Sequence, residues 1–121
     1  MLCIHGSGPL DRNENLPVQR MDIFNTVAAD LAPRGIATLR YDKRGCGRST
    51  GKYYTASYGD LVGDVVAAMR FLRSAEGGAF RRIVLLGHSE GTIIAASVAA
   101  SGGPLDGLVL LAPFVERSTI S

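Results

Sequence analysis

The sequence predicts an α/β fold with a parallel sheet, on three observations. Four short apolar runs alternate along the chain with segments whose apolar residues recur at helical spacing. The apolar runs are continuous rather than alternating, which is typical of parallel strands buried on both faces. Glycine and proline punctuate the junctions between runs and helical segments. Strands that alternate with helices in this way predict a parallel sheet with helices packed on its faces.

Each element follows from its own pattern. The four predicted strands span residues 2–5, 36–41, 83–86 and 107–111. The three predicted helices span residues 22–32, 60–74 and 91–101. The first helix ends at Pro33 to Gly35 and the third at Gly102 to Pro104, both of which are helix-stop sequences. The middle helix has one apolar face, formed by Leu61, Val65, Ala68, Met69 and Leu72.

Length and composition indicate one soluble domain. The chain has 121 residues, of which 46% are hydrophobic and 20% charged. A net charge of +2 is too small to indicate binding to nucleic acid or to an anionic membrane. No apolar run approaches the roughly 20 residues of a membrane span, and the start does not resemble a signal peptide, so we expect a cytoplasmic protein. Both ends look cut, and residues 1–121 are interpreted as a single incomplete domain.

The sequence Gly87-His88-Ser89-Glu90-Gly91 is the most informative motif. It follows a predicted strand and precedes a predicted helix, which is the setting that the G-x-S-x-G nucleophile elbow requires. Gly87 and Gly91 leave room for strand backbone to pack against helix backbone. Ser89 is therefore the candidate catalytic nucleophile, because a sharp strand-to-helix turn projects its hydroxyl above the sheet edge.

A second loop, His5-Gly6-Ser7-Gly8, follows the first predicted strand. Acyl transfer needs two N–H donors that point at one oxyanion, and the residue after the nucleophile ordinarily provides one of them. Here that donor is the backbone N–H of Glu90. The backbone N–H of Ser7 is the candidate for the second, with Gly6 and Gly8 as the glycines of its loop.

Several other residues have a plainer interpretation. His5, at a strand end beside glycines, is favoured as a packed or hydrogen-bonded structural residue rather than a general base. His88 should point away from Ser89. The segment 45–52 fails the spacing of both phosphate-binding and dinucleotide-binding loops.

Two neighbouring features leave alternatives open. The basic residues of the segment 40–52 are expected to pair within their loop or to face solvent, with binding of a substrate anion as a minor possibility. Tyr53, Tyr54 and Tyr58 either line a site entrance or pack on the loop.

Taken together, these motifs resemble the α/β-hydrolase fold, and more narrowly its serine esterase, lysophospholipase-like and serine aminopeptidase-like members. The resemblance rests on HGSGPLDR, RGIATLRYDKRGCGRSTG, RRIVLLGHSEG and LDGLVLLAP, which look like the family's third to sixth strands. It implies that the first strand of this chain lies between the second and the third. A parallel sheet binds ligands at such a topological switch point, beside both candidate loops.

The resemblance implies hydrolysis of a small-molecule carboxylic ester through an acyl-enzyme at Ser89. Peptidase, lipase, thioesterase and acyltransferase activities use the same machinery. No cofactor and no metal are implied. A cap domain, which sets substrate preference in this family, would follow the last strand.

The chain departs from the family in its triad. The family order is serine, acid and then histidine, yet no histidine follows Ser89. Asp106 and Glu116 do not sit where the family's acid lies. We therefore interpret the chain as the central fragment of a hydrolase, inactive alone, with residues 36–41 and 107–111 as open apolar edges. The alternative is a non-catalytic protein that retains the elbow as structure and binds a partner or a small ligand.

Overall fold

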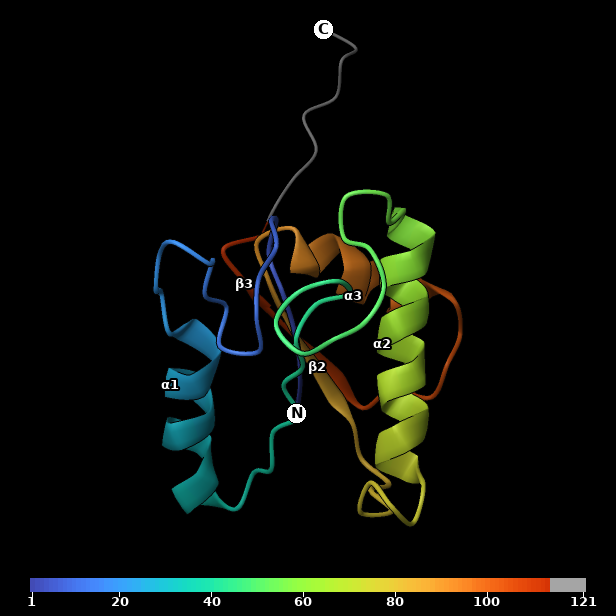
Figure 1. Ribbon diagram of the computed structural model, residues 1–121. Coiled ribbons are helices and arrows are strands. Elements are labelled where there is room, and N and C mark those ends of the chain that lie inside the picture. Colours follow the sequence, from blue (N-terminus) through green and yellow to red (C-terminus); the bar gives the residue numbers. More distant parts are fainter. Residues whose placement is uncertain (114–121) are drawn as a thin grey trace, which may run out of the picture.

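The computed structural model describes residues 1–113, which form a parallel sheet with helices on both faces (Figure 1). The elements in chain order are β1 (Leu2–Ile4), α1 (Ile23–Leu31), the 3₁₀ turn η1 (Ala32–Arg34), α2 (Tyr58–Arg73), β2 (Val84–His88), α3 (Gly91–Ala100) and β3 (Gly107–Leu111). The strands lie in the order β1-β2-β3, and both neighbouring pairs are parallel. The predicted α/β class is confirmed.

The segment predicted as a strand over residues 36–41 joins the sheet only through Leu39. Leu39 forms an isolated parallel bridge with Leu2, in which the N–H of Cys3 donates to the carbonyl of Leu39 at 3.1 Å. No further strand pairs with this segment among the described residues, and Ile36 is 39% exposed. The structure therefore shortens the predicted strand to one bridge, because an apolar run becomes a regular buried strand only where it has partners. The bridge still places β1 between residue 39 and β2, as the resemblance implied.

The core is divided by the sheet into two clusters. Leu2, Ile4 and Leu85 face α2 and α3 and belong to the larger cluster. The intervening residues Cys3 and Leu86 face α1 and form the smaller cluster with its Phe24. This alternation follows from the two-residue side-chain period of a strand. Both faces of β1 and β2 are thus buried, and α1 is the helix that packs against the second cluster.

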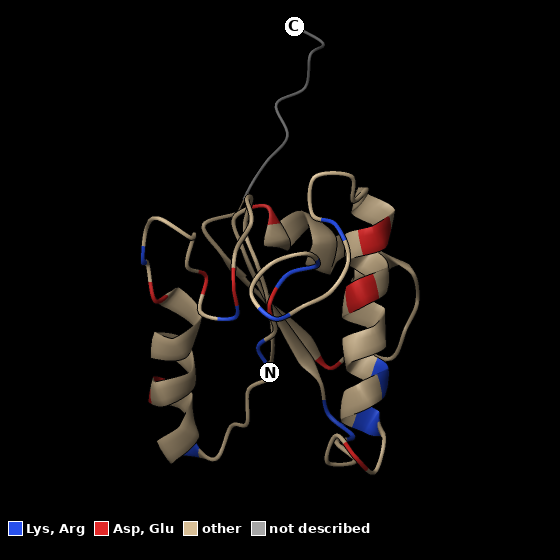
Figure 2. Cartoon of the chain, in the orientation of Figure 1, with Lys and Arg blue, Asp and Glu red and all other residues tan. Residues whose placement is uncertain are grey.

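The start of α2 is fixed by a reciprocal pair of hydrogen bonds. The N–H of Asp60 donates to Ser57 Oγ at 3.1 Å, and the N–H of Ser57 donates to Asp60 Oδ2 at 3.0 Å. Basic side chains, Arg70 and Arg73, lie in the last turn, so the charges complement the helix dipole (Figure 2). None of the helices within residues 1–113 is both long and apolar enough to cross a bilayer.

The register of β1 and β2 positions the two candidate loops. Ile4 pairs with Gly87, so both strands reach the same edge of the sheet at nearly the same level. The loop that begins at His5 and the turn around Ser89 therefore leave the sheet side by side. On the other side of β2, β3 has no outer neighbour in the described part of the chain, and its Leu108, Leu110 and Leu111 are exposed.

Candidate active site

Ser89 occupies a strained turn between β2 and α3. Its φ of 54° lies in the left-handed region that non-glycine residues seldom adopt. The surrounding backbone holds this conformation, because the N–H of Ser89 donates to the carbonyl of Leu111 at 3.0 Å and its carbonyl accepts from the N–H of Thr92 at 2.9 Å. No hydrogen bond to Ser89 Oγ is found among residues 1–113, and the residue is partly exposed. The hydroxyl is thus held at a partly open sheet edge.

The two glycines of the motif allow close backbone contact. A Cβ atom on Gly87 would collide with the backbone of Gly91. A Cβ atom on Gly91 would collide with the carbonyl oxygen of Ile4 and would lie 2.6 Å from that of His5. The turn that carries Ser89 is therefore packed directly against the end of β1.

The loop of residues 6–8 presents one unpaired N–H between two paired ones. The N–H of Gly6 donates to Glu14 Oε1 at 2.7 Å, and the N–H of Gly8 donates to the Tyr53 hydroxyl at 3.0 Å. No acceptor for the N–H of Ser7 is found in the described residues. Ser7 Oγ donates to Glu90 Oε2 at 2.8 Å, which ties this loop to the residue that follows Ser89.

Glu90 also leaves its backbone N–H unpaired among residues 1–113, because it stands at the start of α3. The first N–H groups of a helix have no partner within the helix and carry its positive dipole end. The structure thus brings together Ser89, Ser7 and Glu90, the three residues that the sequence singled out, along with their glycines. It leaves two N–H groups available on either side of the Ser7–Glu90 contact.

Lys43 is buried under the same loop. Only 3% of the residue is exposed, and its Nζ donates to the carbonyls of Gly6 at 2.6 Å and of Gly8 at 2.9 Å. It also lies 5.3 Å from the centre of the Tyr53 ring. Burial lowers the pKa of Lys43, and the nearby carboxylate of Glu90 opposes this change. The expectation that the basic residues of this segment pair within their loop or face solvent is wrong for Lys43.

Glu14 is a second buried ionisable residue that the sequence did not single out. Its residue is fully buried, and Oε1 accepts from the N–H of Gly6 and lies 2.8 Å from His88 Nδ1. Its other oxygen, Oε2, has no hydrogen-bond partner within the described part of the chain. Glu14 therefore connects the loop of residues 6–8 to the last residue of β2. Its polar, turn-rich surroundings in the sequence gave no sign of this burial.

Both histidines form their contacts with residues other than Ser89. His5 Nε2 is 2.6 Å from the carbonyl of Tyr41, and its ring packs edge-on against the Tyr41 ring. Burial, aided by the positive charge of Lys43, lowers the pKa of His5 to about 4. His5 is therefore packed and hydrogen-bonded, as predicted. His88 is turned toward Glu14, and neither histidine forms a hydrogen bond with Ser89 in the described residues.

The loop that follows residue 41 is built around Asp42. This buried carboxylate accepts hydrogen bonds from the N–H and the guanidinium of Arg12 and from the N–H of Arg48. The Arg12 guanidinium holds the pKa of Asp42 well below its usual range. Gly47 lies so close that a Cβ there would collide with the carboxylate. These contacts fix the path of the loop that carries Lys43.

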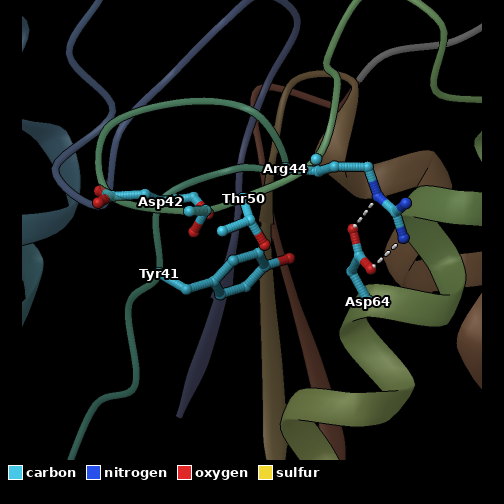
Figure 3. Close-up of a pocket in the computed structure, with 7 residues that line it drawn as sticks. Tyr41, Asp42, Arg44, Thr50 and Asp64 are labelled. Atoms are coloured by element: carbon cyan, nitrogen blue, oxygen red, sulfur yellow. Dashed lines mark hydrogen bonds and ion pairs between the residues drawn. The ribbon is translucent and has the colours of Figure 1, made fainter.

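A polar cavity of about 330 Å³ lies between this loop and α2 (Figure 3). Arg44 reaches across it to Asp64, with hydrogen bonds of 3.0 and 2.7 Å. Asp42 and Asp64 line the same cavity, and its arginine is already paired. This arrangement does not favour the binding of a substrate anion there.

A second cleft, of about 320 Å³, adjoins the residue after Ser89. It is lined by Tyr53, Tyr54, Ala56, Tyr58, Leu61 and Glu90. Tyr53 packs on the loop through its hydrogen bond to Gly8, which is one of the two roles that the sequence left open, and all three tyrosines line this cleft. Because Glu90 forms one wall, the cleft opens beside the candidate nucleophile.

No cluster of three or more histidine, cysteine or acidic residues suited to a metal ion is found in residues 1–113.

Comparisons with known proteins identify the family of the chain. The model of the serine aminopeptidase S33 family matches residues 18–120, which include the turn around Ser89 but not the loop of residues 6–8. The chain is also similar to a protein named esterase EstD from Thermotoga maritima, with 29% identity over 113 residues. That alignment covers 93% of this chain and 26% of the relative, so the chain spans about a quarter of the relative's length. The chain belongs to the serine aminopeptidase S33 family of α/β-hydrolases.

Proposed function

We propose that the protein is a serine hydrolase that cleaves carboxylic esters through an acyl-enzyme formed on Ser89. The observation that carries this proposal is the left-handed backbone of Ser89 at the junction of β2 and α3. Such strain is unfavourable by about 1–3 kcal/mol and tends to persist at functional sites, where the surrounding structure enforces it. Here two backbone hydrogen bonds and the close approach of Gly87 and Gly91 enforce it.

The proposed oxyanion hole consists of the backbone N–H groups of Ser7 and Glu90. Both groups lack an acceptor among residues 1–113, and the Ser7 Oγ to Glu90 Oε2 bond keeps them on adjacent loops. Two fixed donors in place before the reaction stabilise the negative charge that develops on the carbonyl oxygen. The start of α3 adds the positive end of its dipole at the same position.

In the proposed reaction, Ser89 Oγ attacks the acyl carbon and its proton passes to a general base. The tetrahedral intermediate then collapses, and the alcohol leaves with a proton. Water hydrolyses the acyl-enzyme to release the acid and regenerate the serine. His5 and His88 are both engaged elsewhere, so we propose that the base and its orienting acid come from a segment other than residues 1–113.

The ester class is supported by the similarity to the Thermotoga maritima protein named as an esterase and by the aromatic cleft beside Glu90. The lining of this cleft is mixed polar and apolar, and its tyrosine rings offer contact area for the acyl or alcohol group of an ester. Amide, thioester and lipid substrates would use the same nucleophile and donors. In the described residues no general base forms a hydrogen bond with Ser89 Oγ. This observation favours the alternative, a protein that binds a ligand without catalysis.

The test is labelling with a serine-directed fluorophosphonate, together with hydrolysis of an activated aryl ester. We expect the protein in its natural length to be labelled on Ser89 and to hydrolyse the ester, and Ser89→Ala to lose both properties. Ser97→Ala is the matched control, because Ser97 is an exposed serine on α3. The 121-residue chain alone should show negligible turnover. A natural-length protein that is folded yet neither labelled nor active would refute the proposal in favour of the non-catalytic alternative.

A further inference from the structure

The position of the Lys43 ammonium relative to the loop of residues 6–8 suggests an electronic role. Its Nζ donates to the carbonyl oxygen of Gly6 at 2.6 Å. That carbonyl belongs to the same peptide unit as the N–H of Ser7. A charged donor on a peptide oxygen withdraws electron density from the whole unit, and hydrogen bonds polarise one another in this way. The N–H of Ser7 should therefore be a stronger donor than an ordinary amide.

We propose that Lys43 is a positioning residue of the oxyanion hole, which polarises the Gly6–Ser7 peptide and orients the Ser7 N–H toward the reacting carbonyl. This inference rests on the proposed function. It adds to the backbone donors a residue that need not touch the substrate. Lys43 acts on the reacting oxygen through a single intervening peptide unit.

The burial of Lys43 supports a role for its charge. Removing an ammonium from water is costly, and no ion pair between Lys43 and a carboxylate is found in the described residues. Its hydrogen-bond acceptors there are the two carbonyls of the loop. A neutral donor could hold two carbonyls at a lower desolvation penalty. A buried cation also acts through a low dielectric, where it stabilises nearby negative charge more strongly than it would in water.

The rest of the loop explains why the polarisation reaches Ser7. Its neighbours cannot serve as the donor, because the N–H of Gly6 is bound to Glu14 and that of Gly8 to Tyr53. On the far side of Ser7, the Ser7–Gly8 peptide unit is anchored by the bond of the Gly8 N–H to Tyr53, and the second Lys43 bond holds the next carbonyl, that of Gly8. Ser7 is therefore held between two anchored peptide units, and its N–H is the one left to face a ligand.

The test compares three substitutions at Lys43 in the natural-length protein. Lys43→Met keeps the apolar stem but removes charge and donors, Lys43→Gln keeps donors without charge, and Lys43→Arg keeps the charge. Lys52→Met is the control, because Lys52 is an exposed lysine of the same loop. The measurements are kcat and KM for an aryl ester and the Kd of an aryl trifluoromethyl ketone, which forms an anionic tetrahedral adduct with serine.

We expect Lys43→Met and Lys43→Gln to lower kcat about tenfold, a part of the roughly 100- to 1,000-fold lost when a whole oxyanion donor is removed. KM should stay nearly constant, and the ketone should bind more weakly by the same factor as kcat falls. Lys43→Arg should recover most of the activity, and Lys52→Met should match the unmodified protein. A merely structural role would not make the ketone affinity and kcat fall in parallel.

Four outcomes overturn the inference. If the folded Met or Gln variants keep kcat within about twofold, or lose kcat without weakening the ketone, Lys43 does not polarise the site. Should neither neutral variant fold, the carbonyl ¹³C resonance of Gly6 in the unmodified protein decides. When the pH is raised, this Gly6 resonance must shift over the same range in which the Lys43 side-chain resonances show that the ammonium loses its proton. A constant Gly6 resonance overturns the inference. If the unmodified protein is neither labelled on Ser89 nor active, the proposed function has failed and this inference fails with it.

Discussion

Replacing Gly91 with alanine tests whether the turn at Ser89 depends on direct backbone contact. A Cβ on Gly91 would collide with the carbonyl oxygen of Ile4 and would lie 2.6 Å from that of His5. Both obstacles are backbone atoms at the end of a buried strand, so they cannot move as the end of a flexible side chain could. The helix must then shift away from β1. Overpacking of this kind is unfavourable by about 1–3 kcal/mol.

The higher intrinsic helix preference of alanine over glycine acts in the opposite direction, because it stabilises the folded protein. A control substitution must therefore measure this gain alone. Alanine is favoured over glycine within a helix by about 0.8–1 kcal/mol, and by less at the first helical residue, where Gly91 stands. Gly63→Ala isolates this gain, because Gly63 lies within α2 and a Cβ there meets nothing within 4 Å. We expect Gly91→Ala to lower the free energy of unfolding by about 2 kcal/mol and Gly63→Ala to raise it by about 0.5–1 kcal/mol.

Urea unfolding followed by circular dichroism measures both variants against the unmodified protein. The midpoints should move in opposite directions while the denaturant slopes stay similar. Fluorophosphonate labelling of Gly91→Ala should also slow under conditions in which the variant is still folded. Equal stabilities for the two variants would show that strand and helix are not in contact at Gly91, and the geometric basis of the candidate site would fail.

Two further predictions concern buried polar groups. The folded-state pKa of His5, about 4, lies below its ordinary value of 6.5, so the unfolded chain binds more protons between these limits. The contribution of His5 to the free energy of unfolding should therefore be fully present above pH 6.5, and it should fall by about 3 kcal/mol as the pH drops toward 4. Urea titrations at several pH values should find this contribution absent in His5→Gln. Glu14→Ala removes the acceptor of the Gly6 N–H and the partner of His88, and it should lower the free energy of unfolding by about 1–3 kcal/mol. Labelling of Ser89 should slow in the same variant, and unchanged labelling would argue that Glu14 does not hold the loop of residues 6–8.

Most of the fold could be predicted because its signals are local. The apolar run of residues 107–111 became β3 with the same bounds, and the stripe beginning at Leu61 lies in α2. The segment 36–41 shows the limit of this reasoning. Its apolar character indicates a strand, but the length of the ladder depends on partners that the run itself does not reveal.

The same distinction between local signals and contacts distant in sequence applies to the residues of the candidate site. Ser89 and Glu90 belong to one short motif, and Ser7 to another, so their placement follows from the strand that precedes each loop. Glu14 and Lys43 have no such motif, since each acquires its place through contacts distant in sequence. Glu14 meets a histidine 74 residues away, and Lys43 binds a carbonyl 37 residues away. A charged residue in a polar loop looks solvated until the fold buries it.

The contact between Gly91 and the end of β1 also bears on how the site moves. Because Gly91 lies against the carbonyls of Ile4 and His5, the turn cannot lift without displacing the neighbouring loop. The paired amides of Gly6 and Ser89 should then open in one cooperative event rather than through separate loop fluctuations. The proposed nucleophile and the proposed oxyanion donors would thus be assembled or lost together, so that partly formed sites, with Ser89 in place but the Ser7 loop displaced, are rarely populated.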